Sequence, residues 1–179
     1  PEQVSFISVY LKRRYNNREF SVIRLGPGTG VIISIAMAVV LQLIPVSGYF
    51  LLWKPNFLLL VAVGWVIFQP SQWGVGFAAA VGLLADIIFR SPIGLHVLTF
   101  SIIAAIPLFL SGWLVYFSLI HRCVFIFLLT ILAEILRNMV FSMWEIPTDY
   151  SYIPMAALVS VLVWPFIDWF LKNVNYKRN

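Results

Sequence analysis

The stretch GVGFAAAVGLLADIIFR, Gly74 to Arg90, holds the most organised pattern of residues in the chain. It carries no charge before Asp86, and small residues recur at every fourth position, at Gly74, Ala78 and Gly82. On a helix this spacing places them on one face together with Asp86 and Arg90, and small side chains there let another helix approach closely. The stretch therefore predicts a membrane helix that packs tightly against a neighbour.

The composition of the whole chain agrees with this prediction. Of 179 residues, 61% are hydrophobic and 11% charged, whereas an average soluble domain has about 45–50% apolar and about 25% charged residues. A soluble domain of this length needs more charged residues to cover its surface. We therefore expect an all-α membrane protein, a bundle of about six transmembrane helices.

Six apolar segments stand between polar residues or Pro and Gly. They are Val31 to Ile44, Asn56 to Phe68, Gly74 to Phe89, Leu95 to Phe117, Cys123 to Met143 and Ile153 to Leu171. The second would cover only about 20 Å, so we expect it to enter the interface, thin the bilayer or be shielded by its neighbours. We expect cytoplasmic tails over residues 1–29 and 173–179, the six-helix domain over 30–172, and no cleavable signal peptide.

The basic residues predict the orientation of the bundle. With the N-terminus inside, nine Lys and Arg fall in cytoplasmic segments, and only Lys54 and Arg90 fall in outer loops. Cytoplasmic loops of membrane proteins carry such an excess of basic residues. The net charge of +5 therefore indicates topology rather than a nucleic-acid partner. Both termini are expected in the cytoplasm.

Charged residues within the predicted spans are the candidate functional residues. Asp86 and Arg90 could form a local i,i+4 ion pair at the helix end. Alternatively, Asp86 faces inward and joins a polar cluster, because acids inside a membrane usually face protein. Glu134 and Arg137 share one face with Asn138, and either neutralise each other or meet Asp86 or a partner's helix.

The remaining polar residues have simpler interpretations. Asp168 and Lys172 form an i,i+4 pair that snorkelling explains. His96 and His121 fall on opposite sides of the predicted bilayer, so they cannot share a metal site, and we interpret both as structural. The lone Cys123 gives neither a disulfide nor a thiolate metal site.

Signals for an enzyme are missing from the sequence. It contains no HExxH or GxSxG motif, and Ser101 and Ser111 have no evident base beside them. We therefore expect no catalytic residue, metal or cofactor.

Three segments together resemble the rod shape-determining protein MreD family. They are WKPNFLLLVAVGWVIFQP (Trp53 to Pro70), GFAAAVGLLADIIFRSPIGLHVLTFSI (Gly76 to Ile102) and LVWPFIDWFLK (Leu162 to Lys172). The likeness covers roughly Leu41 to Lys172 in order and spacing and does not extend over residues 1–29. It implies a non-enzymatic component of the cell-elongation machinery in the bacterial cytoplasmic membrane, with a fold similar to the S components of vitamin transporters.

The resemblance also implies partners and site residues. Such proteins bind MreC and help connect MreB filaments to the peptidoglycan synthases, RodA and its partner transpeptidase. The positions carried over as structural or partner-binding are Pro55, Asn56, Gly82, Asp86 and Gly94, to which their place in the spans adds Arg90, Glu134 and Arg137. No catalytic role is transferred.

Two other functions are open at this point. The likeness to S components, with Asp86, Glu134 and Arg137 converging, would suit a membrane protein that binds or transports a small solute. An intramembrane hydrolase would need a nucleophile and a base within reach of each other. The scaffold that binds MreC is the leading hypothesis, with membrane lipid around it.

Overall fold

The computed structural model describes residues 28–45, 53–114, 116–144 and 150–176, and side chains as far as residue 173. Within these residues the chain forms helices and no strands. The helices are α2 (Thr29–Leu43), α4 (Phe57–Phe68), α5 (Val75–Phe89), α6 (Leu95–Phe109), the single turn α7 (Ser111–Leu114), α8 (Leu119–Met143) and α9 (Ile153–Tyr176). Six main helices thus lie where six apolar segments were predicted.

Helix α4 forms the centre of the bundle. Its nine consecutive residues from Leu58 to Val66 are all buried, as expected for a helix that is apolar on every side. It contacts α2, α5, α6 and α9. Of the three explanations for this short segment, shielding by neighbours is therefore the one that the structure supports.

Helices α5 and α6 form a hairpin that is held by the small-residue face of α5. Ala78 and Gly82 are buried, and a Cβ atom on Gly82 would lie 2.6 Å from the carbonyl oxygen of His96. A Cβ on Gly74 would contact Leu108, farther along α6. The predicted close contact is confirmed, and the helix that fills it is the next one in the chain.

Helices α8 and α9 are the two longest. By length and composition both could cross a membrane, and only 22% and 33% of their apolar windows are buried inside the protein. A core helix of a soluble protein would be mostly buried. The other four main helices are apolar but have only 12 to 15 residues.

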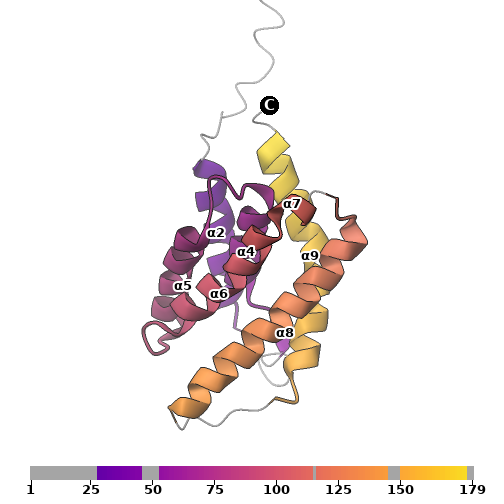
Figure 1. Cartoon of the computed structure of the whole chain (residues 1–179). Coiled ribbons are helices and arrows are strands. Elements are labelled where there is room, and N and C mark those ends of the chain that lie inside the picture. The colour runs from indigo at the N-terminus through magenta and orange to yellow at the C-terminus, as the bar shows by residue number, and fades with distance from the viewer. Residues whose placement is uncertain (1–27, 46–52, 115, 145–149, 177–179) are drawn as a thin grey trace, which may run out of the picture.

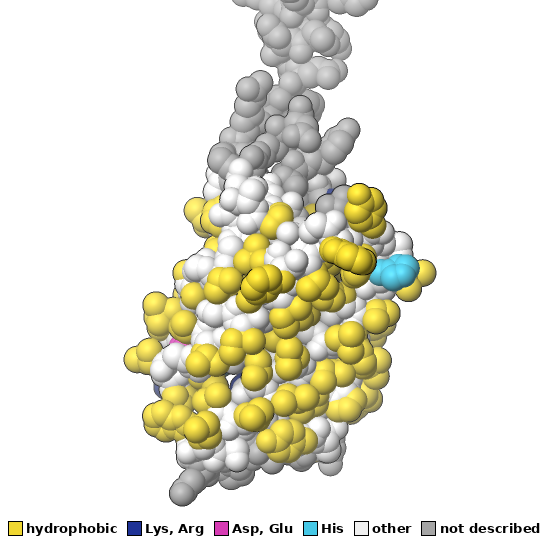
Figure 2. Space-filling view, viewed as in Figure 1, with side chains coloured by type: hydrophobic (Ala, Val, Ile, Leu, Met, Phe, Trp, Pro, Cys, Tyr) yellow, Lys and Arg dark blue, Asp and Glu magenta, His cyan; other side chains and the backbone are white. Residues whose placement is uncertain are grey.

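The outer surface is strongly apolar. Figure 2 shows hydrophobic side chains spread over the visible face, with few charged ones between them. On α9, Leu158, Leu162 and Phe166 are 50%, 71% and 75% exposed at i,i+4 spacing. Soluble monomers rarely expose continuous apolar patches of more than a few hundred Å². The surface therefore fits a lipid environment.

Several helix ends differ from the predicted bounds. The segment from Leu95 to Phe117 was expected to be one continuous helix. Helix α6 ends at Phe109, and α7 follows as a separate turn. Pro107 lies in the last turn of α6, where its missing N–H leaves the Ile103 carbonyl without its helical hydrogen bond and weakens this turn. Helix α8 begins four residues before Cys123, and α9 runs five residues beyond Leu171.

The helices alternate in direction through the bundle. In Figure 1, α2 begins and α9 ends at the top, while the α5–α6 turn and the start of α9 lie at the bottom. Helix α8 begins at the upper right and runs down to the bottom. The bundle therefore has two ends, which we name the terminal end, where α2 begins and α9 ends, and the hairpin end, where α5 turns into α6.

Candidate functional site

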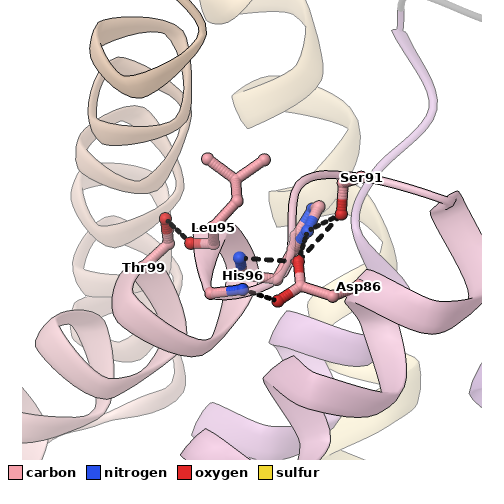
Figure 3. A network of polar contacts seen from close by, with 6 residues as sticks. Asp86, Ser91, Leu95, His96 and Thr99 are labelled. Carbon is pink, nitrogen blue, oxygen red and sulfur yellow. Dashed lines mark hydrogen bonds and ion pairs between the residues drawn. The ribbon is translucent and has the colours of Figure 1, made fainter. Parts of the chain in front are cut away.

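The Asp86 carboxylate organises a buried polar cluster at the hairpin end, drawn in Figure 3. Its Oδ2 accepts a hydrogen bond from the Gly94 backbone N–H at 2.8 Å. Its Oδ1 accepts from the His96 N–H at 2.9 Å and from the Ser91 hydroxyl at 2.8 Å, and lies 2.8 Å from His96 Nδ1. Asp86 and His96 are 2% and 4% exposed. The charge is thus buried but fully hydrogen-bonded, as a buried carboxylate requires.

The backbone between α5 and α6 brings these groups together. Arg90 ends α5 in a left-handed conformation with φ of 52°, and Gly94 begins α6 with φ of 104°, which favours glycine. The first N–H groups of α6 then point at Asp86. A carboxylate is favourable there because a helix N-terminus has free N–H donors and a positive partial charge. The acid of α5 therefore caps α6.

The predicted ion pair between Asp86 and Arg90 is not found among the described residues. Arg90 is exposed, and the helix has already ended at Phe89, so i,i+4 geometry no longer applies at Arg90. The other interpretation, an inward Asp86, agrees with the structure. Its partners are Ser91, Gly94 and His96 rather than the predicted Glu134 or Arg137.

The arrangement of Ser91 and His96 suits structure rather than nucleophilic catalysis. An ionised carboxylate only accepts hydrogen bonds, so His96 Nδ1 carries the proton that lies toward Asp86. Ser91 Oγ lies 3.1 Å from the same nitrogen. A catalytic base needs an unprotonated nitrogen facing the hydroxyl. Ser101 donates its hydroxyl to the Val97 carbonyl at 2.6 Å, as in a serine that bonds back to its own helix.

Glu134 and Arg137 form an ion pair on α8. Their side chains are 11% and 36% exposed, and Arg137 Nε is buried without a hydrogen-bond partner. Mutual neutralisation of Glu134 and Arg137 is therefore confirmed.

A second charged cluster lies at the terminal end. Asp168 on α9 is paired with Lys172 on the same helix, as predicted. Its other oxygen lies 3.2 Å from Arg122 Nη1 at the start of α8. The Arg122 guanidinium and the Lys172 amine lie 5.3 and 5.9 Å from the centre of the Phe68 ring. Snorkelling alone does not describe this cluster, because it joins α4, α8 and α9.

Pro55 and Asn56 have a structural place at the start of α4. Asn56 Oδ1 accepts a hydrogen bond from the Leu59 N–H at 3.1 Å, which is an N-cap. Pro55 before it is buried. The Lys54 amine donates to the carbonyls of Gln42 and Ile44 at 2.6 and 2.8 Å, and partial burial lowers its pKa. This segment fastens α2 to α4.

Sequence reasoning missed the roles of His96 and Arg122. The signal for His96 was an acid near the end of one helix and a glycine just before the next, since a short turn brings the acid to the helix N-terminus. No comparable local signal existed for Arg122, because its carboxylate partner is 46 residues away. Such a pairing depends on which helices pack together.

Comparison with known proteins agrees with the resemblance found in the sequence. A family model described as rod shape-determining protein MreD matches residues 24–174. The rod shape-determining protein MreD of Haemophilus influenzae is 30% identical over 148 residues, which are 79% of this chain and 87% of the relative. No solved structure matches the chain, so the likeness to S components stays a prediction. Since both matches span most of the sequence, the chain belongs to the rod shape-determining protein MreD family.

Proposed function

We propose that this chain is a non-enzymatic scaffold of the bacterial cell-elongation complex, which binds MreC and links MreB filaments to RodA and its partner transpeptidase. The observation that carries the proposal is that the polar groups of the described bundle hold helices to one another, while its outer faces are apolar. Such a protein can act through helix contacts in the membrane. Family membership supports the role in cell shape.

The partner helix must use an outer face of the bundle. The small-residue face of α5 is already filled by α6, because Gly82 contacts the backbone of His96 and Val97. The exposed apolar faces of α2, α8 and α9 remain, together with the outward faces of α5 and α6. We infer that MreC binds one of these faces rather than the glycine groove.

We also propose that the chain crosses the cytoplasmic membrane six times with both termini inside. Arg122 and Lys172 lie at the terminal end, while Lys54 and Arg90 lie near the starts of α4 and α6, at the hairpin end. Single cysteines introduced at Arg90 and Lys172 in a Cys123→Ser background would test this. In intact spheroplasts, an impermeant maleimide should label the cysteine at Arg90 and not the one at Lys172; the reverse pattern would refute the orientation.

Binding to MreC is tested by co-purification from membranes in mild detergent. Triple replacement of Leu158, Leu162 and Phe166 by alanine alters an outer face of α9 without touching a buried residue. A second triple variant replaces Ile32, Met37 and Val40, which are exposed on α2. We expect wild-type protein to retain MreC and the variant of the face that MreC uses to lose it. If wild-type protein retains no MreC and its depletion leaves cells rod-shaped, the scaffold proposal fails.

The structure favours the scaffold over the solute-binding alternative. The centre of the bundle is occupied by α4, with nine consecutive buried residues, and solute sites require a concave pocket with converging polar groups. Asp86 is satisfied by the α5–α6 turn and Glu134 is paired with Arg137, so neither carboxylate is left without a partner for a solute to replace.

A further inference from the structure

The cluster of Arg122, Asp168 and Lys172 has an excess of positive charge. Asp168 has a side chain that is only 4% exposed, and each of its two oxygens already has a cationic partner. Among the described residues, two cations therefore share one carboxylate, and one positive charge is left over. Excess charge next to an apolar surface is costly unless an anion lies nearby.

The two cations differ in how much hydrogen-bonding capacity remains. The Lys172 side chain is 52% exposed, so most of its ammonium group can reach an external ligand. The Arg122 side chain is 16% exposed, and its Nε is buried without a partner. Burial has thus removed water from the guanidinium, while its Nη1 has a partner in Asp168 and its Nε has none. A second anion beside it would offset that cost.

The depth of the cluster matches a membrane surface. From Ile153 to Lys172, α9 rises about 30 Å, which is about the thickness of the hydrocarbon core. Arg122 lies about the same distance from the end of α8 at Met143. Trp169, which is 65% exposed, precedes Lys172 by three residues, and tryptophan is typical of the membrane interface. Lipid phosphates lie at this depth.

We propose that Arg122 and Lys172 form a binding site for the phosphate of an anionic phospholipid at the terminal end of the bundle. Asp168 positions both cations and sets the net charge of the site at +1. Phe68 lies beneath the two cations and forms an apolar floor. The lipid would fasten α8 to α9 and to the end of α4.

The proposal can be tested by native mass spectrometry of the full chain in detergent. Phosphatidylglycerol and phosphatidylcholine with identical acyl chains are titrated separately, and inorganic phosphate is added as a competitor. Lys172→Gln removes the excess charge but leaves the Arg122–Asp168 pair, so the fold should persist; thermal unfolding checks this. Lys54→Gln removes the same charge at the other end of the bundle. Asp168→Asn raises the charge of the site.

We expect wild-type protein and the Lys54→Gln variant to retain phosphatidylglycerol in preference to phosphatidylcholine. Lys172→Gln should bind it about fivefold more weakly, and Asp168→Asn at least as tightly as wild type. Equal retention of both lipids by wild type, or an unchanged affinity in a folded Lys172→Gln variant, would overturn the proposal. Displacement of the lipid by millimolar inorganic phosphate would assign the site to soluble phosphates and overturn the lipid assignment.

Discussion

Gly82→Ala should push α5 and α6 apart, because there is no room for a methyl group between them. Its Cβ would lie 2.6 Å from the His96 carbonyl oxygen and 2.8 Å from Val97 Cα, both of which are backbone atoms that cannot rotate away. Ordinary contact begins at 3.4 Å, so relief of the closest contact requires a separation of about 0.8 Å.

The separation also affects the Asp86 cap. If α5 and α6 separate by this amount along the direction of the hydrogen bond, the 2.9 Å distance between His96 N and Asp86 Oδ1 increases to about 3.7 Å. That distance is too long for a hydrogen bond. Overpacking costs about 1–3 kcal/mol and the lost bond about 1 kcal/mol. The higher helix propensity of alanine offsets about 1 kcal/mol of this loss in stability. We expect a net loss of about 2 kcal/mol.

Thermal unfolding in detergent, followed by the fluorescence of the seven tryptophans, would measure this loss. A change of that size should lower Tm by about 4–8 °C. Gly76→Ala is the matched control, since it lies on the same helix and no atom is within 4 Å of the added Cβ. It should leave Tm unchanged or raise it. Equal Tm values for the two variants would refute the close approach of α5 and α6.

Substitutions at four further residues test the polar contacts by the same measurement. Asp86→Ala leaves several buried donors without an acceptor and should lower the free energy of unfolding by about 3 kcal/mol. Asp86→Asn keeps one acceptor oxygen and should lower it by less. Equal losses for the two variants would contradict the capping role. Arg137→Leu should destabilise the protein by about 2 kcal/mol because it leaves Glu134 unpaired. Adding Glu134→Gln to this variant should restore most of the lost stability. No recovery in the double variant would mean that the two residues act independently. Trp65→Phe removes the 2.8 Å bond from the indole N–H to Ser34 and should cost about 1 kcal/mol; an unchanged Tm would mean that this bond contributes nothing.

The helices themselves could be predicted from the sequence to within a few residues. The predicted segment from Asn56 to Phe68 became α4, Phe57–Phe68, with Asn56 as its cap. Helix formation depends on hydrogen bonds between residues four apart and on the polarity of the local segment, and both can be seen in the sequence. The break after Phe109 was not predicted, because Pro107 can be accommodated inside a longer membrane helix.

The polar sites were predicted only where both partners share one helix. The pairs of Glu134 with Arg137 and of Asp168 with Lys172 follow from helical spacing, and both are present. The partners of Asp86 were not predicted, because they depend on how the chain turns through Arg90 and Gly94. A residue in left-handed conformation redirects the chain, and its effect on distant atoms cannot be obtained from spacing.

Residue spacing alone was enough to predict a bundle of apolar helices with a close-packing face on α5 and ion pairs within α8 and within α9. It could not predict that α6 fills this face, that Asp86 caps α6, or that Arg122 completes the cluster around Asp168. Periodicity fixes which residues share a face, whereas the pairing of faces depends on the packing of the whole bundle. A buried charge then takes whichever donors that packing brings within reach.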